Sequence, residues 1–422
     1  MAELLKALSI GEIKSKFRVR LDKVVIENRA FRLFSRVTVG CLFVCAGLVS
    51  LQQLVGKHIE CIVPPKEDIR PGALDQYCFI MGTYTVPELY NLTVGIDIAH
   101  PGVGTFHFDD EEESKQQYHT WYQWVPIALF FQGMTFLLPH MLWKAFEKEK
   151  IKAYCDLEVA SKINLKVRSL NDNSDPEKKR NTISKAAVYF VGTMSYNNFY
   201  AYAYVFCEIL NILILAFNFY FTDVFLGGGD FANYGPEVVA FSKLEDTEGL
   251  ISPMDRIFPK VSKCDFHKYG PSGGLIRYDI MCILAINIIN EKIYVFLWFW
   301  FIILFCLGLL AVLYRVAVFA FPGIRNLLIR RRTDPRYRDA LNYVLRGMSY
   351  PDWFVLRKLN DNINTIRFGE LVQGIKAELM KKSPEGRLSS SPLPAYAESD
   401  KSYKDTDEDG DVMTNLVNKD IV

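Results

Sequence analysis

Long apolar blocks alternate with charged and polar segments along the 422 residues of this chain. Four of the blocks reach the roughly 20 residues that a helix needs to cross the hydrocarbon core of a membrane. One such block can be a buried helix of a soluble protein, but four in one chain favour membrane spans. The predicted spans are residues 37–55, 122–143, 203–226 and 293–321.

The segments between these spans differ in charge, and the difference predicts the side of the membrane that each one occupies. The first 36 residues carry nine Lys and Arg against four acids and lack the apolar core of a secretory signal, so they are expected to stay in the cytosol. The segment after the first span carries only four Lys and Arg against eleven acids. Short cytosolic segments are rich in Lys and Arg. The expected cytosolic parts are residues 1–36, 144–202, 322–382 and 383–422, and the expected outer loops are residues 56–121 and 227–292.

The cytosolic segments after the last span differ in their expected order. Residues 322–382 have helical patterning and mixed charge, which predicts a helical cap. Residues 383–422 have the Ser, Pro, Asp and Lys content of a disordered tail. Because the chain ends in Asp420-Ile421-Val422, a PDZ domain is a candidate partner, although a chance match of three residues is the commoner explanation.

The first twenty residues place apolar side chains at the spacing of a short amphipathic helix. Such a helix can lie flat on the bilayer surface. It can also fold back into the mouth of a pore, where Glu3 and Lys6 would meet passing ions. The periodicity fits both arrangements.

Four of the nine cysteines fall in the expected outer loops, namely Cys61 and Cys78 in the first and Cys264 and Cys282 in the second. An even number of cysteines in an oxidising compartment predicts disulfides, and four cysteines allow three connectivities. Zinc binding is the alternative, but neither pair has the short CxxC spacing of structural zinc sites. The sequence therefore predicts disulfides, with no metal and no cofactor.

Few polar residues interrupt the predicted spans. The first span contains Thr38, Ser50, Gln52 and Gln53, which are uncharged and are candidates to line a water-filled path. Glu208 is the conspicuous charge in the third span, and a charge at mid-membrane costs roughly 2.5–3.5 kcal/mol. Because it lies near the expected inner end of its helix, a satisfied or snorkelling carboxylate is favoured over a gating acid.

Two prolines, Pro126 and Pro139, lie in the second predicted span. Proline kinks the axis of a transmembrane helix without breaking the span. A passive bend is the default expectation at both positions, and a gating hinge is the alternative.

Several short motifs cluster at the start of the second span and in the second outer loop. The span begins Trp121-Tyr-Gln-Trp-Val-Pro126, with Trp where the innexin signature YYQWV has its first Tyr; either aromatic ring anchors a helix end at the interface. Each outer loop has two cysteines, where connexins would show three. The second loop reads Leu226-Gly-Gly, Tyr234-Gly235, Phe258-Pro259, Lys263-Cys264, Gly270-Pro-Ser-Gly273 and, at its end, residues 287–301. Up to its tail, the chain resembles the innexins.

The resemblance implies a fold and an assembly. The fold would be an all-α membrane protein, a four-helix subunit with a small disulfide-stapled extracellular α+β domain and a helical cytosolic cap. The implied disulfides are Cys61–Cys282 and Cys78–Cys264. Identical subunits, eight to a hemichannel, would surround a wide pore in the plasma membrane, in some assemblies together with other innexin subunits. Two hemichannels docked head to head would form a gap junction that passes ions and small metabolites passively.

Asn91-Leu92-Thr93 is the one N-x-[ST] glycosylation acceptor in the sequence, and it falls in the first outer loop. A bulky glycan on a docking face would oppose contact between two hemichannels. Because the resemblance favours junctions, any glycan on Asn91 is expected off the docking surface; an unused acceptor is the alternative.

Other classes of protein fit less well. The six histidines form no HExxH pattern, and no Walker or GxSxG motif occurs, so no enzyme is predicted. A carrier would show paired repeats and broken helices. A four-span adhesion scaffold would share the topology and the cysteine-bearing loops, and an undocked pannexin-like hemichannel is the alternative among channels.

Overall fold

The computed structural model describes most of the chain between residues 24 and 382. The expected N-terminal helix with Glu3 and Lys6, and the 383–422 tail with its PDZ-type end, lie outside the described residues. For residues 71 and 176–182 only the backbone is described. The described ranges are residues 24–63, 70–104, 116–148, 150–151, 154, 176–227, 231–244 and 249–382.

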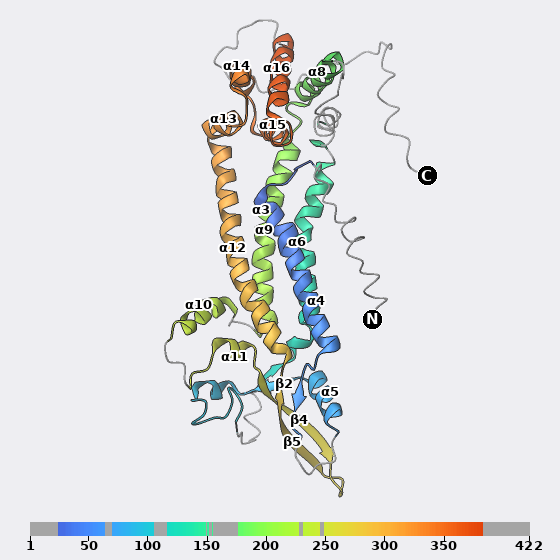
Figure 1. Ribbon diagram of the computed structural model, residues 1–422, viewed down its shortest axis with the longest axis vertical. Coiled ribbons are helices and arrows are strands. Elements are labelled where there is room, and N and C mark those ends of the chain that lie inside the picture. Colours follow the sequence, from blue (N-terminus) through green and yellow to red (C-terminus); the bar gives the residue numbers. More distant parts are fainter. Residues whose placement is uncertain are drawn as a thin grey trace, which may run out of the picture. The chain divides into compact units, whose positions relative to one another are not determined.

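Within the described part of the chain, four helices are long and apolar enough to cross a membrane, in agreement with the four predicted spans (Figure 1). The first runs over residues Arg29–Val55 as α3 (Arg29–Arg32), a π-helical turn (Leu33–Thr38) and α4 (Val39–Val55). The others are α6 (Val125–Glu147), α9 (Asn198–Phe225) and α12 (Ile286–Ala320).

The helices extend beyond the apolar blocks that predicted them. α12 begins at Ile286, seven residues before the predicted span, because Asn287, Asn290 and Glu291 are polar but buried against other parts of the chain. The first helix likewise begins at Arg29 rather than at residue 37. Hydropathy finds residues that suit lipid, whereas helix ends depend on contacts with protein.

Strands from both loops form one antiparallel sheet at one end of the four long helices (Figure 1). Its order is β1-β5-β4-β2-β3, so strands of the second loop lie between strands of the first. The strands are β1 (Glu60–Cys61), β2 (Thr83–Thr85), β3 (Gln117–His119), β4 (Val261–Tyr269) and β5 (Leu275–Ile283). Around them lie α5 (Pro71–Met81), α10 (Phe231–Ser242), α11 (Pro253–Ile257) and the 3-10 turns Pro87–Asn91 and Trp121–Gln123. We call this region the sheet domain.

Short helices cover the opposite end of the long helices and form what we call the helical cap (Figure 1). Its core is built on α15, whose Trp353, Phe354 and Leu356 are buried. The same core includes Tyr204 of α9 and Val318 of α12, so the cap packs directly on the ends of two long helices. The cap comprises α8 (Pro176–Thr193), α13 (Pro322–Arg330), the 3-10 turn Pro335–Tyr337, α14 (Arg338–Leu345), α15 (Tyr350–Asn362) and α16 (Thr365–Lys382).

The two prolines of the second span occupy different positions in α6. Pro126 lies in the first turn, where a missing N–H costs nothing and the fixed φ suits the helix start. The expected kink at Pro126 is therefore wrong. Pro139 lies inside the helix, so the choice between a passive bend and a hinge concerns Pro139 alone.

Candidate functional site

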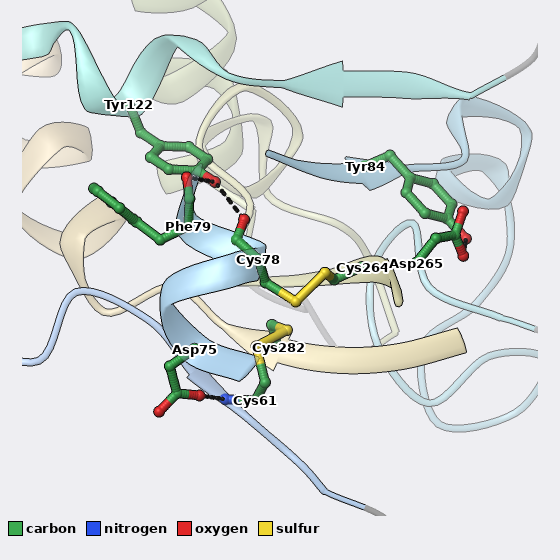
Figure 2. The surroundings of a disulfide bond; sticks show 9 residues. All are labelled: Cys61, Asp75, Cys78, Phe79, Tyr84, Tyr122, Cys264, Asp265 and Cys282. Carbon is green, nitrogen blue, oxygen red and sulfur yellow. Dashed lines mark hydrogen bonds between the residues drawn. A yellow bond between two sulfur atoms is a disulfide. The ribbon is translucent and has the colours of Figure 1, made fainter. Parts of the chain in front are cut away.

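Two disulfides join the first loop to the second across the sheet domain (Figure 2). Cys61 bonds Cys282, 221 residues away, and Cys78 bonds Cys264, 186 residues away. These are the pairs that the family resemblance implies. Among the described residues, the thiols of Cys41, Cys45, Cys207 and Cys306 in the long helices are free.

Strand pairing explains why these cysteines meet. Cys61 of β1 is the direct cross-strand partner of Cys282 in β5, so the register of the sheet holds the two side by side. Cys78 projects from α5 toward Cys264 in β4. The backbone N–H of Cys61 also donates to Asp75 Oδ1 of α5 at 2.8 Å, which fixes that helix against the first strand.

The Trp121-Tyr-Gln motif completes the other end of α5. The Tyr122 hydroxyl donates to the carbonyls of Cys78 and Phe79, and Gln123 Nε2 donates to Phe79 O and Ile80 O. Carbonyls in the last turn of a helix have no partner within the helix. The motif that precedes α6 therefore caps α5 and couples the stapled helix to the second long helix.

His119 lies at the end of β3, next to the Trp121-Tyr-Gln motif. Its ring is 2% exposed and its Nε2 lies 2.8 Å from Thr85 Oγ1 on the adjacent strand β2. Burial in the sheet domain disfavours the charged ring and lowers the pKa of His119 to about 4. The structure thus holds this histidine neutral at physiological pH.

A buried ion pair joins α9 to α12 at the cap end of the long helices. Arg315 donates to both carboxylate oxygens of Glu208, each at 2.7 Å. Asn28 Nδ2 adds a third hydrogen bond to Glu208 Oε1 at 2.7 Å. Glu208 is therefore satisfied, as the sequence favoured, but by a partner that sequence reasoning missed. The available signal was the single arginine within the fourth apolar block.

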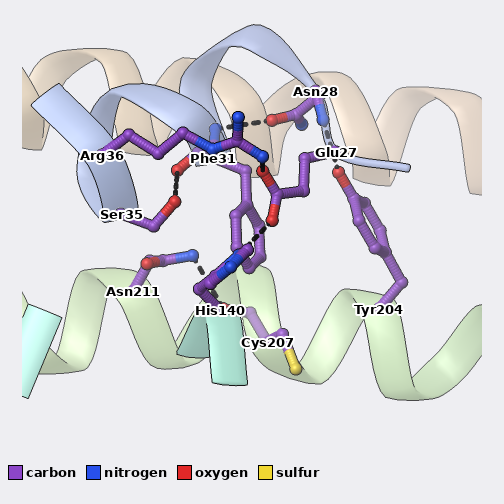
Figure 3. Close-up of polar contacts among 9 residues, drawn as sticks. All are labelled: Glu27, Asn28, Phe31, Ser35, Arg36, His140, Tyr204, Cys207 and Asn211. Atoms are coloured by element: carbon purple, nitrogen blue, oxygen red, sulfur yellow. Dashed lines mark hydrogen bonds and ion pairs between the residues drawn. The ribbon is translucent and has the colours of Figure 1, made fainter. Parts of the chain in front are cut away.

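Asn28 makes this ion pair an anchor for the segment that precedes the first span. Its backbone N–H donates to the Tyr204 hydroxyl at 3.0 Å, and its Oδ1 accepts from Phe31 N to cap α3. Figure 3 shows Asn28, Phe31 and Tyr204 converging where the first helix begins. One residue therefore starts α3 and ties it to α9.

Glu27 makes a second link from the same segment. Its buried carboxylate contacts His140 Nδ1 of α6 and lies 3.2 Å from Arg36 of the first span (Figure 3). Burial raises the pKa of Glu27, but the hydrogen bond to His140 and the positive charges of His140 and Arg36 outweigh burial, so the pKa is lowered. We call Glu27, Asn28, His140, Glu208 and Arg315 the polar cluster.

Lys358 of α15, in the helical cap, lies next to the polar cluster. Its ammonium lies 4.6 Å from the centre of the Tyr204 ring, and the residue is 5% exposed. Burial and the nearby positive charge of Arg315 lower the pKa of Lys358 to about 8. The carboxylate of Glu208 acts in the opposite direction.

The polar residues of the first span do not share one environment. Thr38 is fully buried, accepts a hydrogen bond from Trp300 Nε1 at 3.0 Å and donates to Leu33 O, so it does not face water. Ser50 and Gln52 are half-buried, and Gln53 Nε2 donates to Tyr122 O at the sheet domain. Ser50, Gln52 and Gln53, each half-buried, thus remain candidates for a water-filled path.

Asn91 is exposed at the end of the 3-10 turn Pro87–Asn91, and Thr93 of the same acceptor is also exposed. Asn91 borders a groove of about 280 Å³ that Pro253 and Arg256 of the second loop also line. The acceptor is therefore open to solvent at the boundary between the two loops.

Comparison with known proteins shows the family to which this chain belongs. The innexin family model matches residues 27–379. The chain is 40% identical to Innexin inx2 of Drosophila melanogaster over 369 residues, which cover 87% of this chain and 95% of that protein. It is 40% identical to Innexin inx2 of Schistocerca americana over 86% of this chain and 95% of that one, and 38% identical to Innexin inx3 of Drosophila melanogaster over 85% and 86%. The chain belongs to the innexin family, whose members are gap-junction channel subunits.

Proposed function

We propose that copies of this chain form a hemichannel in the plasma membrane that docks head to head with a hemichannel of the adjacent cell. The resulting passage carries ions and small metabolites passively. The observation that carries this proposal is the sheet domain, in which both loops are joined by two disulfides and one sheet. A docking surface binds more tightly when its shape is already fixed before the partner binds, and links within the protein fix that shape.

The orientation follows from redox chemistry and charge. Disulfides form and persist in oxidising compartments, so the sheet domain is proposed to lie outside the cell. The helical cap carries Arg330, Arg331 and Arg332 at the end of α13, the helix that follows the last long helix, as expected of a cytosolic segment. Both termini are then cytosolic.

The tip of the β4–β5 hairpin is our candidate for the centre of docking. The hairpin extends away from the long helices (Figure 1), and its paired residues Tyr269 and Leu275 are 75% and 66% exposed. Ile276 beside them is 39% exposed. Adjacent apolar side chains in water favour contact with another protein surface, here the same hairpin of an opposed copy.

The pore is proposed to run along the first span of each subunit. In an assembly of eight, Ser50 and Gln52 supply uncharged polar groups along the path. The segment before Glu27, with Glu3 and Lys6, would lie at the cytosolic mouth, anchored by the polar cluster. A path lined by such groups is expected to select weakly among ions.

Paired cells test the proposal directly. Each cell of an apposed pair expresses the chain, and voltage clamp of both cells measures junctional current while an injected dye reports passage of small molecules. We expect current and dye transfer between cells. Current in single cells without coupling in pairs would support an undocked hemichannel instead, and surface protein without any conductance would support an adhesion scaffold.

A further inference from the structure

Helix α13 carries one face that no other described part of the chain covers. α12 ends at Ala320, Phe321 breaks the helix, and α13 follows at once. One side of α13 packs against the core of the helical cap through Leu328 and the buried Ile329. The opposite side is exposed: Phe321 is 61% exposed and Leu327 49%, and Arg330 and Arg331 are also exposed. We call Phe321, Leu327, Arg330 and Arg331 the α13 face.

The charge of the α13 face is not neutralised within the described chain. α13 contains no acidic residue, and neither Arg330 nor Arg331 forms an ion pair with any residue that the structure describes. Nearby arginines differ in this respect, because Arg332 contacts Asp361 and Arg336 contacts Asp334. Two adjacent guanidinium groups are thus left to bind an external anion.

The apolar half of the α13 face follows the last long helix directly along the chain. Phe319, just before the break, is 54% exposed on α12 and precedes Phe321 and Leu327 along the chain. α12 has the highest mean hydropathy of the four long helices and is long enough to cross the membrane. Apolar side chains beside arginines at a helix end match the acyl chains and charged headgroups of a bilayer boundary.

We propose that the α13 face binds an anionic phospholipid of the inner leaflet. The phosphate groups would lie between Arg330 and Arg331, and the acyl chains along Phe321 and Leu327. This proposal rests on the cytosolic placement of the cap proposed above. The sequence also contains an acidic stretch at residues 405–411, which is a second candidate anion. Because the α13 face directly follows α12, a helix long enough to cross the membrane, the lipid is the better match.

A lipid bound there would act on the whole cap. Trp353 Nε1 donates to Arg325 O, and Arg357 donates to Leu328 O at 2.7 Å, so two side chains of α15 hold the backbone of α13. α15 also carries Lys358, which contacts Tyr204 beside the polar cluster. The composition of the inner leaflet would therefore bias the position of the cap relative to α9.

Lipid retention by the purified full-length channel tests the proposal. The channel is placed in phosphatidylcholine nanodiscs containing a minor fraction of phosphatidylserine or phosphatidylinositol bisphosphate, and native mass spectrometry counts the anionic lipids that stay bound. Each basic residue at an anionic surface contributes about fivefold to binding. Arg330→Gln/Arg331→Gln is therefore expected to reduce retention by roughly tenfold or more. Arg336→Gln/Arg338→Gln, an equal charge loss off the α13 face, is the matched control and should change retention less than about twofold.

A second variant separates a lipid from a soluble anion. Leu327→Ser should weaken retention of the lipid and leave unchanged any binding of free inositol trisphosphate, because only the lipid has acyl chains. Competition by free inositol trisphosphate equal to that of the intact lipid would overturn the proposal. Loss of binding of a peptide of residues 400–422 in Arg330→Gln/Arg331→Gln, with lipid retention unchanged, would assign the face to the tail instead.

The proposed channel function is measured separately on the same preparation. Conductance of wild type in pure phosphatidylcholine vesicles reports pore formation without any anionic lipid. A conducting channel whose anionic lipid retention is unaffected by Arg330→Gln/Arg331→Gln refutes the lipid site alone. A preparation that retains lipid through Arg330 and Arg331 but never conducts refutes the channel alone.

Discussion

The sheet domain and the polar cluster both join distant parts of the chain, but by different chemistry. At the sheet domain, two covalent bonds join loops 221 and 186 residues apart. At the cap end, Glu208 and Arg315 lie 107 residues apart and join α9 to α12 by an ion pair, without a covalent bond. A disulfide chiefly constrains the unfolded chain, whereas a buried ion pair must offset the cost of removing two charges from water.

The difference suits what each end is proposed to do. A docking surface benefits from one fixed shape, which covalent links preserve in the absence of a partner. The segment before the first span is proposed to hold its place near a pore mouth. Glu27 and Asn28 hold it by hydrogen bonds and charge alone, without a covalent link.

The largest expected effect comes from breaking one half of the ion pair. Arg315→Met leaves the carboxylate of Glu208 buried without its main partner, which should lower the free energy of unfolding by about 3–5 kcal/mol. Thermal melting of the purified protein measures the loss. The exposed Arg338→Gln serves as control and should melt like wild type.

The double variant Glu208→Gln/Arg315→Met sharpens the comparison, because it removes both charges. The introduced glutamine side chain would still accept a hydrogen bond from Asn28 Nδ2. Paired removal of buried charges is often nearly neutral, so most of the lost stability should return. A double variant as unstable as Arg315→Met would mean that the ion pair contributes more than the cost of its desolvation.

Breaking one covalent link should cost slightly less in free energy and more in function. Cys78→Ser removes the bond to Cys264 and should destabilise the sheet domain by about 2–5 kcal/mol. Junctional current between paired cells should then be lost. The control is Cys306→Ser, which removes an exposed free thiol of α12 and should leave coupling unchanged. Full coupling by Cys78→Ser at wild-type surface level would show that docking does not need this bond.

Sequence reasoning succeeded where a property belongs to a continuous run of residues. The four spans were found because each needs about twenty apolar residues in a row. It failed where one residue acts through a distant partner. Arg315 lies within the most apolar block of the chain, where hydropathy does not reveal a buried ion pair, and Thr38 is buried because the fold brings Trp300 against it.

The disulfides also depend on partners that are distant in the sequence. From the cysteines alone, three connectivities were open, and the pairing entered only through the family resemblance. In the structure, the cross-strand register of Cys61 with Cys282 decides one bond, and the position of α5 over β4 decides the other. Neither is a local property of the sequence, because β5 and β4 of the second loop lie between β1 and β2 of the first loop in the sheet.

A pH dependence is expected at the sheet domain from His119. Its folded pKa of about 4 lies below the unfolded value of 6.5, so the unfolded state binds the proton first. The stability contribution is complete above pH 6.5 and is lost as pH falls toward 4, by up to roughly 3 kcal/mol. His119→Gln keeps a partner for Thr85 without titrating in this range, so its melting temperature should fall less on acidification. Equal acid sensitivity of the two proteins would place the effect elsewhere.

The smallest effect on coupling is expected from Asn91→Gln, which tests the border of the docking surface rather than its centre. Asn91 is exposed beside a groove that Pro253 of α11 also lines, whereas the candidate docking tip is formed by Tyr269 and Leu275 of the hairpin. In Figure 1, α11 lies near the start of the hairpin and not at its tip. A glycan on Asn91 would therefore extend from the flank.

Treatment of wild type with a glycosidase should shift its electrophoretic mobility to that of Asn91→Gln, while both proteins give the same junctional current in paired cells. The matched challenge moves the acceptor to the hairpin by Ser272→Asn/Gly274→Thr, which creates an Asn-x-Thr acceptor at the tip and leaves Tyr269 and Leu275 in place. Because a hydrated glycan there would separate opposed surfaces, that variant should reach the membrane and lose coupling. If instead Asn91→Gln gains coupling that wild type lacks, the native assembly is an undocked hemichannel, and the glycan on Asn91 is what prevents docking.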